Sequence, residues 1–179
     1  MDDRIQRLRE GDEEAFEQVV TQFGSMVVNL SFRFIGNKPD AEDVTQDVFI
    51  KFWKNINSYK GESSLKTWIY RITVNESLNF VRRKKINSFI GLLESAILPS
   101  EHSSEDSLIK KEESNLVRKA IRALPKNQRI AIILRSFKNL SYHEIAEIME
   151  ISKSSVESLL FRAKKGLKRK LTGYYFSKY

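Results

Sequence analysis

The sequence predicts an all-α fold, with two small helical domains joined by an extended linker. Only 7 Gly and 3 Pro interrupt 179 residues, so few positions break a helix. Apolar residues recur at intervals of three and four over most of the chain, which is the spacing of amphipathic helices. No stretch alternates as a half-buried strand does, and one polar, acidic segment separates two helical regions.

The first predicted domain, residues 1–88, contains three long helices. Asp12 is a typical N-cap for the first helix, and Gly36 lies just past its end. Pro39 and Asp40 open the second helix, and Ser64 can cap the third. Their apolar stripes, which we assign to a core, are Phe16, Val19, Val20, Phe23, Val27 and Leu30; Val44, Val48, Phe52 and Ile56; and Leu65, Trp68, Ile69, Ile72, Leu78 and Val81.

Residues 89–107 are predicted to form the linker, because "LPSEHSSEDS" is polar, acidic and contains proline. The second domain is predicted at residues 108–179. It begins with a helix from Leu108 to Leu124, breaks at Pro125 and continues with a helix from Asn127 to Phe137.

A pair of short helices follows in "EIAEIMEISKSSVESLLFRAKK". Ser141 and Glu144 form a capping box for the first helix, and Ser152 is a natural N-cap for the second. The spacing of a small residue, a turn, a valine and a leucine is typical of a helix-turn-helix. Its core is predicted from Ile145, Ala146, Ile148, Ile151, Val156 and Leu159. Glu150 occupies a turn position where glycine is usual, so we expect an unusual turn backbone or a local cost of ~1 kcal/mol.

The charge distribution favours polyanionic partners at two places. The net charge is +8 and the pI about 9.6. Residues 1–50 hold 5 basic and 11 acidic side chains, whereas residues 51–90 hold 9 and 2. Residues 91–115 hold 2 basic and 6 acidic side chains, and residues 116–179 hold 15 basic and 4 acidic ones. Two basic blocks are therefore separated by an acidic strip, an alternation that a single nucleic-acid face would not need.

Several functional classes are excluded by composition. The absence of cysteine excludes disulfides, thiolate metal sites and a cysteine nucleophile. The charged N-terminus is unlike a signal peptide and the apolar runs are too short for a membrane span, so we expect a cytoplasmic protein. His102 and His143 have no catalytic partners, and the carboxylates of Glu42, Asp43 and Asp47 suit a solvated or partner-facing helix. We expect no enzymatic activity, cofactor, metal or small-molecule substrate.

Two surfaces of the first domain are candidates for binding. On the second helix, an acidic face with apolar anchors suits a basic partner protein; it comprises Asp43, Gln46, Asp47, Phe49, Ile50 and Trp53. The third helix combines rings, amides and basic groups, as binding of unstacked bases requires; the residues are Trp68, Tyr70, Asn75, Asn79, Arg82, Arg83 and Lys84. The alternatives are that Trp68 belongs to the core and that the basic run is a solvated helix end.

The helix-turn-helix is the candidate site for duplex DNA. The early turns of its second helix could enter a major groove through Ser152, Lys153, Ser154, Ser155, Glu157 and Ser158, while Arg162, Lys164 and Lys165 follow on the same helix and could contact phosphates. If six phosphates were neutralised, a plot of log affinity against log salt concentration would have a slope of about −5. The alternative is an amphipathic pair with a solvated basic face.

The order and spacing of these motifs resemble the bacterial sigma-70 family of RNA polymerase sigma factors, in its extracytoplasmic-function (ECF) group. The resemblance is carried by "DAEDVTQDVFIKFW", "SSLKTWIYRITVN" and "LSYHEIAEIMEISKSSVESLLFRAKKGLKRKL", together with "GDEEAFEQVV" and "ALPKNQRIAIILR". It implies that the acidic face of the second helix binds the β′ subunit of core RNA polymerase. It also implies that the segment with Gly61, Ser63, Ser64 and Lys66, continuing through Trp68, Asn75 and Asn79, captures and melts the −10 element.

The same resemblance implies that residues 152–165 read the −35 element and that residues 89–107 thread through the polymerase. The implied partners are core polymerase (β′ and β subunits), duplex promoter DNA, the melted −10 strand and an anti-sigma factor that can hold the protein at the inner membrane. Housekeeping members carry more rings than Trp68 and Tyr70 in this region, which implies weaker melting here. The alternative function is a helix-turn-helix regulator that acts without being a polymerase subunit.

Overall fold

The computed structural model describes the backbone of residues 3–94, 116–138 and 140–177, and the side chains of residues 3–86, 116–136 and 140–172. Within these ranges all regular structure is helical and no strand occurs, which confirms the predicted all-α fold. The chain divides into two compact units with a boundary between Ser88 and Phe89.

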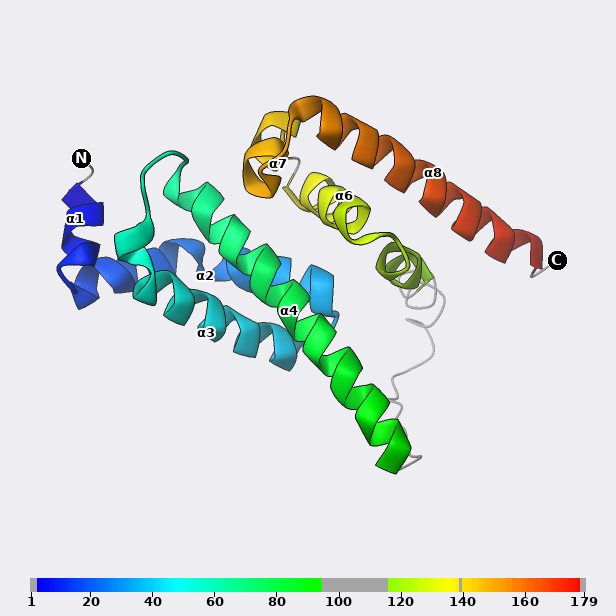
Figure 1. Ribbon diagram of the computed structural model, residues 1–179, viewed down its shortest axis with the longest axis horizontal. Coiled ribbons are helices and arrows are strands. Elements are labelled where there is room, and N and C mark those ends of the chain that lie inside the picture. The colour runs from blue at the N-terminus through cyan, green and yellow to red at the C-terminus, as the bar shows by residue number, and fades with distance from the viewer. Residues whose placement is uncertain (1–2, 95–115, 139, 178–179) are drawn as a thin grey trace, which may run out of the picture. The chain divides into compact units, whose positions relative to one another are not determined.

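The first unit consists of helices α1 (Asp3–Arg9), α2 (Glu13–Ile35), α3 (Lys38–Lys54) and α4 (Leu65–Glu94), with a 3-10 turn, η1 (Ile56–Ser58), after α3. Helices α2 and α3 pack side by side and α4 crosses them (Figure 1). This arrangement places one long face of α3 and one of α4 outside the bundle.

Local hydrogen bonds explain where the helices of this unit begin and end. The Asp12 carboxylate accepts from the Ala15 N–H at 3.1 Å, and Gly36 ends α2 in the left-handed region with φ 80°. The Ser64 hydroxyl accepts from the Thr67 N–H at 3.0 Å and caps α4. These three predictions are confirmed. Helix α3 begins slightly earlier than predicted, because Asn37 supplies its cap.

Helix α1 was not predicted, and it is anchored to the rest of the unit. Ile5 and Leu8 are buried, and the Arg7 guanidinium lies 2.7 Å from the Asp12 carboxylate. The pKa of Asp12 lies below its ordinary value because the Ala15 N–H and then Arg7 stabilise the charged carboxylate. At the other end of the unit, α4 continues to Glu94. It therefore extends past the predicted domain boundary at residue 88, and residues 95–107 of the predicted linker lie outside the described ranges.

The core of the first unit forms where the stripes of α2, α3 and α4 meet. Side chains with at most 1% exposure include Val19, Val27, Leu30, Val44, Val48, Phe52, Ile69 and Tyr70. Burial of each large apolar side chain contributes about 1.5–3 kcal/mol. A chain of rings continues this core: Phe16 lies 4.7 Å from Trp53, and Trp68 lies 5.3 Å from Phe52, measured between ring centroids.

The second unit contains a helix whose described part is residues 116–122, then α6 (Lys126–Lys138), α7 (Tyr142–Met149) and α8 (Lys153–Ser177). The predicted break at Pro125 is confirmed, whereas residues 108–115 of the predicted first helix lie outside the described ranges. Helices α6 and α8 pack together. A Cβ atom on Gly166 of α8 would lie 3.1 Å from Leu124, so the small residue permits a close approach.

Both predicted caps of the helix pair are present. The Ser141 N–H donates to the Glu144 carboxylate at 2.7 Å and the Glu144 N–H donates back to the Ser141 hydroxyl at 3.2 Å, which is the reciprocal capping box. The Ser152 hydroxyl accepts from the Ser155 N–H at 3.2 Å.

The predicted core of the pair needs one correction. Ile145, Ile148 and Val156 are buried, but Leu160 rather than Leu159 is the next fully buried residue of α8. Its position follows from the helix period, because Val156, Leu160 and Ala163 recur at four and three residues along one face. Leu159, like Ile151 and Ala146, is only partly buried.

The turn between α7 and α8 has the unusual backbone that its sequence predicts. Glu150 adopts φ 55°, and no other non-glycine residue of the described ranges has a positive φ. A side chain in this left-handed region is disfavoured because its Cβ crowds the following carbonyl oxygen. The helix-turn-helix therefore forms with a local cost that glycine would avoid.

We expect Glu150→Gly to stabilise the second unit by about 1 kcal/mol, because glycine adopts positive φ without this crowding. Urea denaturation followed by circular dichroism, together with hydrogen exchange of α7 and α8 amides, measures the change. Glu147→Gly is the matched control, since the same substitution inside α7 should destabilise by a similar amount. Both tryptophans lie in the first unit, so their fluorescence should be unaffected. Equal destabilisation by both substitutions would contradict the explanation.

Candidate protein and nucleic-acid interfaces

Helix α3 presents an exposed stripe at the spacing the sequence predicts. Asp43, Gln46, Asp47 and Ile50 are all exposed, and they recur at three, four and seven residues along one side of the helix. Ile50 is 50% exposed, so an apolar side chain stands among acidic and amide groups. An apolar anchor surrounded by polar groups is the usual composition of a protein-binding surface.

Two residues predicted for this stripe are less exposed than the others, and one of them lies in the core. Phe49 is only 5% exposed and its ring lies 6.5 Å from the Phe16 ring, so it contributes to the core instead of to a free surface. The reason is its position, one residue from the buried Val48 on the inner side of α3. Trp53 is half-buried against Phe16 and keeps part of its ring at the surface.

Ion pairs connect α3 with the basic side of α4. Lys51 lies 2.6 Å from Glu76, Arg83 lies 3.9 Å from Asp47, and Lys84 pairs with Asp40. The Arg83–Asp47 pair joins two exposed groups, and such a pair contributes about 0–1 kcal/mol, so a partner can replace it at little cost. Arg82, Arg83 and Lys84 are all exposed, as a phosphate-binding role requires.

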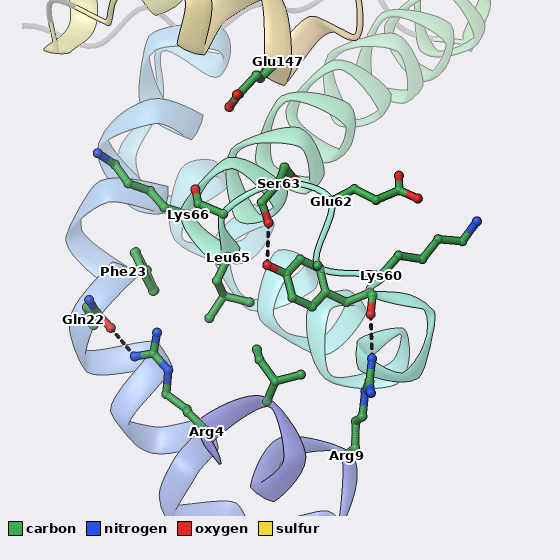
Figure 2. Close-up of a pocket in the computed structure, with 14 residues that line it drawn as sticks. Arg4, Arg9, Gln22, Phe23, Lys60, Glu62, Ser63, Leu65, Lys66 and Glu147 are labelled. Atoms are coloured by element: carbon green, nitrogen blue, oxygen red, sulfur yellow. Dashed lines mark hydrogen bonds between the residues drawn. The ribbon is translucent and has the colours of Figure 1, made fainter. Parts of the chain in front are cut away.

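The loop between η1 and α4 borders a pocket of the first unit (Figure 2). Helices α1 and α2 supply Arg4, Ile5, Arg9, Gln22 and Phe23, and residues 59–66 supply the other side. The predicted residues Gly61, Ser63, Ser64 and Lys66 are brought together here. The backbone of Gly61 has φ 74°, which glycine adopts readily and other residues rarely do.

The loop residues differ in what their side chains can do. The Ser64 hydroxyl is used to cap α4, so its contribution is structural in this state. The Ser63 carbonyl accepts a hydrogen bond from the Tyr59 hydroxyl at 2.5 Å. Lys66 is exposed, with its ammonium 6.0 Å from the Tyr70 ring centroid, and is placed to attract an anionic ligand at the pocket.

Along α4, the predicted amides are more accessible than the predicted rings. Asn75 is exposed and Asn79 partly so. Trp68 is half-buried between Phe52 and Tyr59, which supports its interpretation as a core residue more than as a free stacking surface. Tyr70 is 1% exposed, so its predicted stacking on bases does not fit the structure. The two-residue step from Trp68 turns Tyr70 toward the inside of the bundle.

Helix α8 presents the second exposed stripe. Around the buried Val156, Leu160 and Ala163, the predicted DNA-binding residues of α8 are all exposed, and Ser154, Ser158 and Lys165 lie directly opposite the buried face; the full set is Lys153, Ser154, Ser155, Glu157, Ser158, Arg162, Lys164 and Lys165. All were predicted. Ser152 is exposed too, but its hydroxyl is engaged with Ser154 and Ser155 as well as capping the helix.

Sequence reasoning missed Phe161 on this stripe. Its side chain is 69% exposed, the largest value among the exposed large apolar residues, and it follows Ser154 and Ser158 by seven and three positions. A phenylalanine between serines and basic residues is a signal that helical phase could have found. Apolar contact with thymine methyl groups is one way in which such a side chain reads DNA.

The described residues show neither a membrane span nor a metal centre. Within residues 3–94, 116–138 and 140–177, no helix is both long and apolar enough to cross a bilayer. In the same ranges, His, Asp and Glu side chains form no group of three or more that could hold a metal ion.

Comparisons with known proteins agree with this geometry. Residues 19–86 match the family model "Sigma-70 region 2", and residues 114–167 match "Sigma-70, region 4". The ECF RNA polymerase sigma-E factor of Escherichia coli (strain K12) is 34% identical over 93% of this chain and 92% of its own length. The ECF RNA polymerase sigma factor SigW of Bacillus subtilis (strain 168) is 31% identical over 94% of this chain and 95% of its own length.

Two solved structures share the fold. CnrH in complex with the cytosolic domain of CnrY superposes with a TM-score of 0.69 over 95% of this chain and 96% of that one, at 20% identity. The sigma factor RpoE of Bartonella quintana, in complex with the anti-sigma factor NepR, superposes with a TM-score of 0.62. The match covers 88% of this chain and 96% of that one, at 26% identity.

The relatives do not favour a regulator that acts without polymerase, and sigma factors in general are not enzymes. The two family regions occur in the expected order, and the similarity to ECF factors extends over more than nine-tenths of the chain. The two exposed stripes are consistent with the same assignment. The chain belongs to the sigma-70 family as an ECF sigma factor, and it directs promoter-specific initiation by RNA polymerase.

Proposed function

We propose that the two units divide the work of promoter recognition. Residues 1–88 bind core polymerase and recognise and melt the −10 element, residues 108–179 read the −35 element, and residues 89–107 connect them inside the polymerase. The observation that carries this division is the α3 stripe, which is acidic with an apolar anchor and therefore unsuited to DNA, although the same unit exposes a basic end of α4.

The α3 stripe is the proposed contact with the β′ subunit. Ile50 supplies the apolar anchor, Asp43 and Asp47 supply negative charge, and Trp53 adds the exposed edge of its ring. Desolvated anchors dominate binding energy at such surfaces, whereas surrounding charges steer association. Phe49 acts indirectly, by fixing the packing beneath the stripe.

The proposed −10 surface is the loop at Gly61–Lys66 with the exposed side of α4. Asn75 and Asn79 can read base edges, and the basic group Arg82, Arg83 and Lys84 can follow the phosphates. The pocket beside the loop is bordered by Phe23 and by both basic and acidic side chains, Lys66 and Glu62 among them, so the ring can contact a base while the lysine attracts its phosphate. With Tyr70 buried and Trp68 half-buried, stacking contributes little here until the helix bundle rearranges.

The proposed −35 surface is the α8 stripe. Ser154, Glu157 and Ser158 lie on the early turns that enter a major groove, and Arg162, Lys164 and Lys165 lie near the phosphates. Phe161 lies between these groups, where we propose contact with a thymine methyl or a deoxyribose.

We further propose that this protein is cytoplasmic, has no catalytic activity and is regulated by an anti-sigma factor, which can hold it at the inner membrane. The complex of the Bartonella quintana factor with NepR supports the anti-sigma partner. We also propose that it serves a regulon of its own, separate from that of the housekeeping factor.

Run-off transcription on a promoter library, with and without core polymerase, tests the proposal. We expect initiation only with both proteins, and a gel shift should show poor binding of promoter DNA by the free chain. Tight, specific operator binding without polymerase would contradict it. The selected promoters should match at both elements, because few rings are available for melting; efficient opening of promoters with a badly mismatched −10 would contradict this dependence.

At the polymerase surface, we expect Ile50→Ala to weaken binding of core polymerase about tenfold, because it removes an exposed apolar anchor that the complex would bury. Asp43→Lys together with Asp47→Lys should reduce the association rate most strongly at low salt. Surface plasmon resonance with core polymerase measures both. Glu17→Lys is the matched control, since it reverses an exposed charge on α2 of the same unit. An equal loss in this control would indicate a general charge effect.

At the −35 element, we expect Phe161→Ala to reduce discrimination at one base pair about tenfold, and Arg162→Ala to weaken binding to all sequences. Lys165→Ala should lower the salt slope of holoenzyme binding by about 1, because one phosphate contact is lost. Titration of holoenzyme with labelled promoters at several salt concentrations measures these effects. Lys119→Ala, an exposed lysine of the same unit outside α8, should change neither quantity.

A further inference from the structure

The loop before α4 is short of restraints of its own. Lys60, Gly61 and Glu62 are exposed, and Gly61 permits a backbone conformation that other residues rarely adopt. Such a segment loses much conformational freedom when it becomes ordered on a ligand. A loop that recognises a base therefore benefits from contacts that hold it in one shape beforehand.

Tyr59 supplies these contacts in three directions. Its hydroxyl donates to the Ser63 carbonyl at 2.5 Å, which closes the loop across its base. Its own carbonyl accepts from the Arg9 guanidinium at 2.7 Å. Its ring packs on Trp68, with 5.1 Å between centroids. Figure 2 shows the bond from Arg9 at one end of the loop and the bond to Ser63 at the other.

Arg9 comes from a helix fifty positions earlier in the chain, and that helix is itself fixed. Leu8 is 1% exposed, and Arg4 donates to Gln22 of α2 at 2.7 Å. Arg7 pairs with Asp12 at 2.7 Å at the junction of α1 and α2. The guanidinium of Arg9 therefore meets the loop from a rigid base, and the bond transmits the position of α1 to residues 59–63.

We infer that Arg9 and Tyr59 are positioning residues for recognition of the −10 element: they hold the loop in the shape that receives a base. The inference rests on the proposed role of the loop and deepens it. It assigns to α1 a part in −10 recognition, which α1 performs through its bond to the loop backbone. Tyr59 and Arg9 act through the loop backbone and need not touch DNA.

The test uses holoenzyme with a promoter selected from the library. Tyr59→Phe removes the hydroxyl and keeps the ring on Trp68, and Arg9→Ala removes the bond to the carbonyl. Each should reduce the ratio of open-complex formation between a matched and a singly substituted −10 element about three- to tenfold, the effect of one hydrogen bond. The double variant should lose little more than either single one, because both bonds serve one loop shape. Fluorescence of 2-aminopurine in the −10 element reports opening.

Three controls separate positioning from general stability. Arg9→Lys keeps a donor and should recover part of the discrimination. Gln6→Ala changes an exposed residue of α1 whose side chain donates to Glu10, away from the loop, and should have no effect. Core-polymerase affinity should stay close to that of the unchanged protein in all variants, and the thermal unfolding midpoint of the first unit should fall by no more than about 4–8 °C, the effect of one hydrogen bond on a domain of this size.

The outcomes also distinguish this inference from the proposed function. If Tyr59→Phe and Arg9→Ala leave discrimination unchanged while Lys66→Ala lowers it, the loop recognises the −10 element and the positioning role is wrong. If Lys66→Ala and Gly61→Ala also leave discrimination unchanged, the proposed role of the loop itself is wrong. If discrimination and thermal stability fall together, and Arg9→Lys restores neither, the two residues serve stability alone and the inference is overturned.

Discussion

The burial of Val156, Leu160 and Ala163 fixes the rotation of α8 about its axis, and this rotation decides which side chains face outward to form the proposed −35 surface. The same constraint acts on α3, where the buried Val44 and Val48 turn the acidic stripe outward. Each helix can bury only one face, and the residues at the remaining phases become the binding surface. Core packing and function are thus coupled: an insertion of one residue within either helix would rotate the binding residues by about 100°.

In the first unit, the two proposed surfaces share charges. Asp47 belongs to the α3 stripe and Arg83 to the basic end of α4, yet they pair with each other at 3.9 Å. Because exposed pairs are weak and easily screened, polymerase and DNA can each take one member without a large penalty. The pairing also lowers the exposed charge of each surface when neither partner is bound. This arrangement favours simultaneous binding of both partners. If polymerase takes Asp47 out of the pair, Arg83 becomes available to DNA, and the reverse also holds.

Most of the correct sequence predictions rest on local signals, chiefly helix caps. The caps at Asp12, Ser64, Ser141 and Ser152 depend on hydrogen bonds within three or four residues, so they can be predicted without a tertiary structure. The errors concern phase and distance. Tyr70 and Leu159 were assigned to the wrong side because a one-residue error in phase is 100° of rotation. The bond from Arg9 to Tyr59 could not be predicted, since it joins residues fifty apart and depends on how α1 packs. Residues predicted for the polymerase and DNA surfaces were mostly found exposed, but their roles are tested only by binding experiments.

The burial of aromatic side chains also bears on how a promoter is opened. Stacking on a free ring is worth about 1–3 kcal/mol per base, and the rings of Trp68 and Tyr70 are largely used within the bundle. The α4 residues of the proposed −10 surface that remain exposed carry amides and charges, which would read and hold bases without supplying much energy to separate them. If one polymerase holds both proposed DNA surfaces, binding of the −35 element keeps the −10 element at a high effective concentration near the first unit. Binding at the −35 element would then support capture of the −10 element. Dependence on both elements then follows from the core of the first unit, because the rings that stabilise the fold are the same rings that are withheld from the DNA.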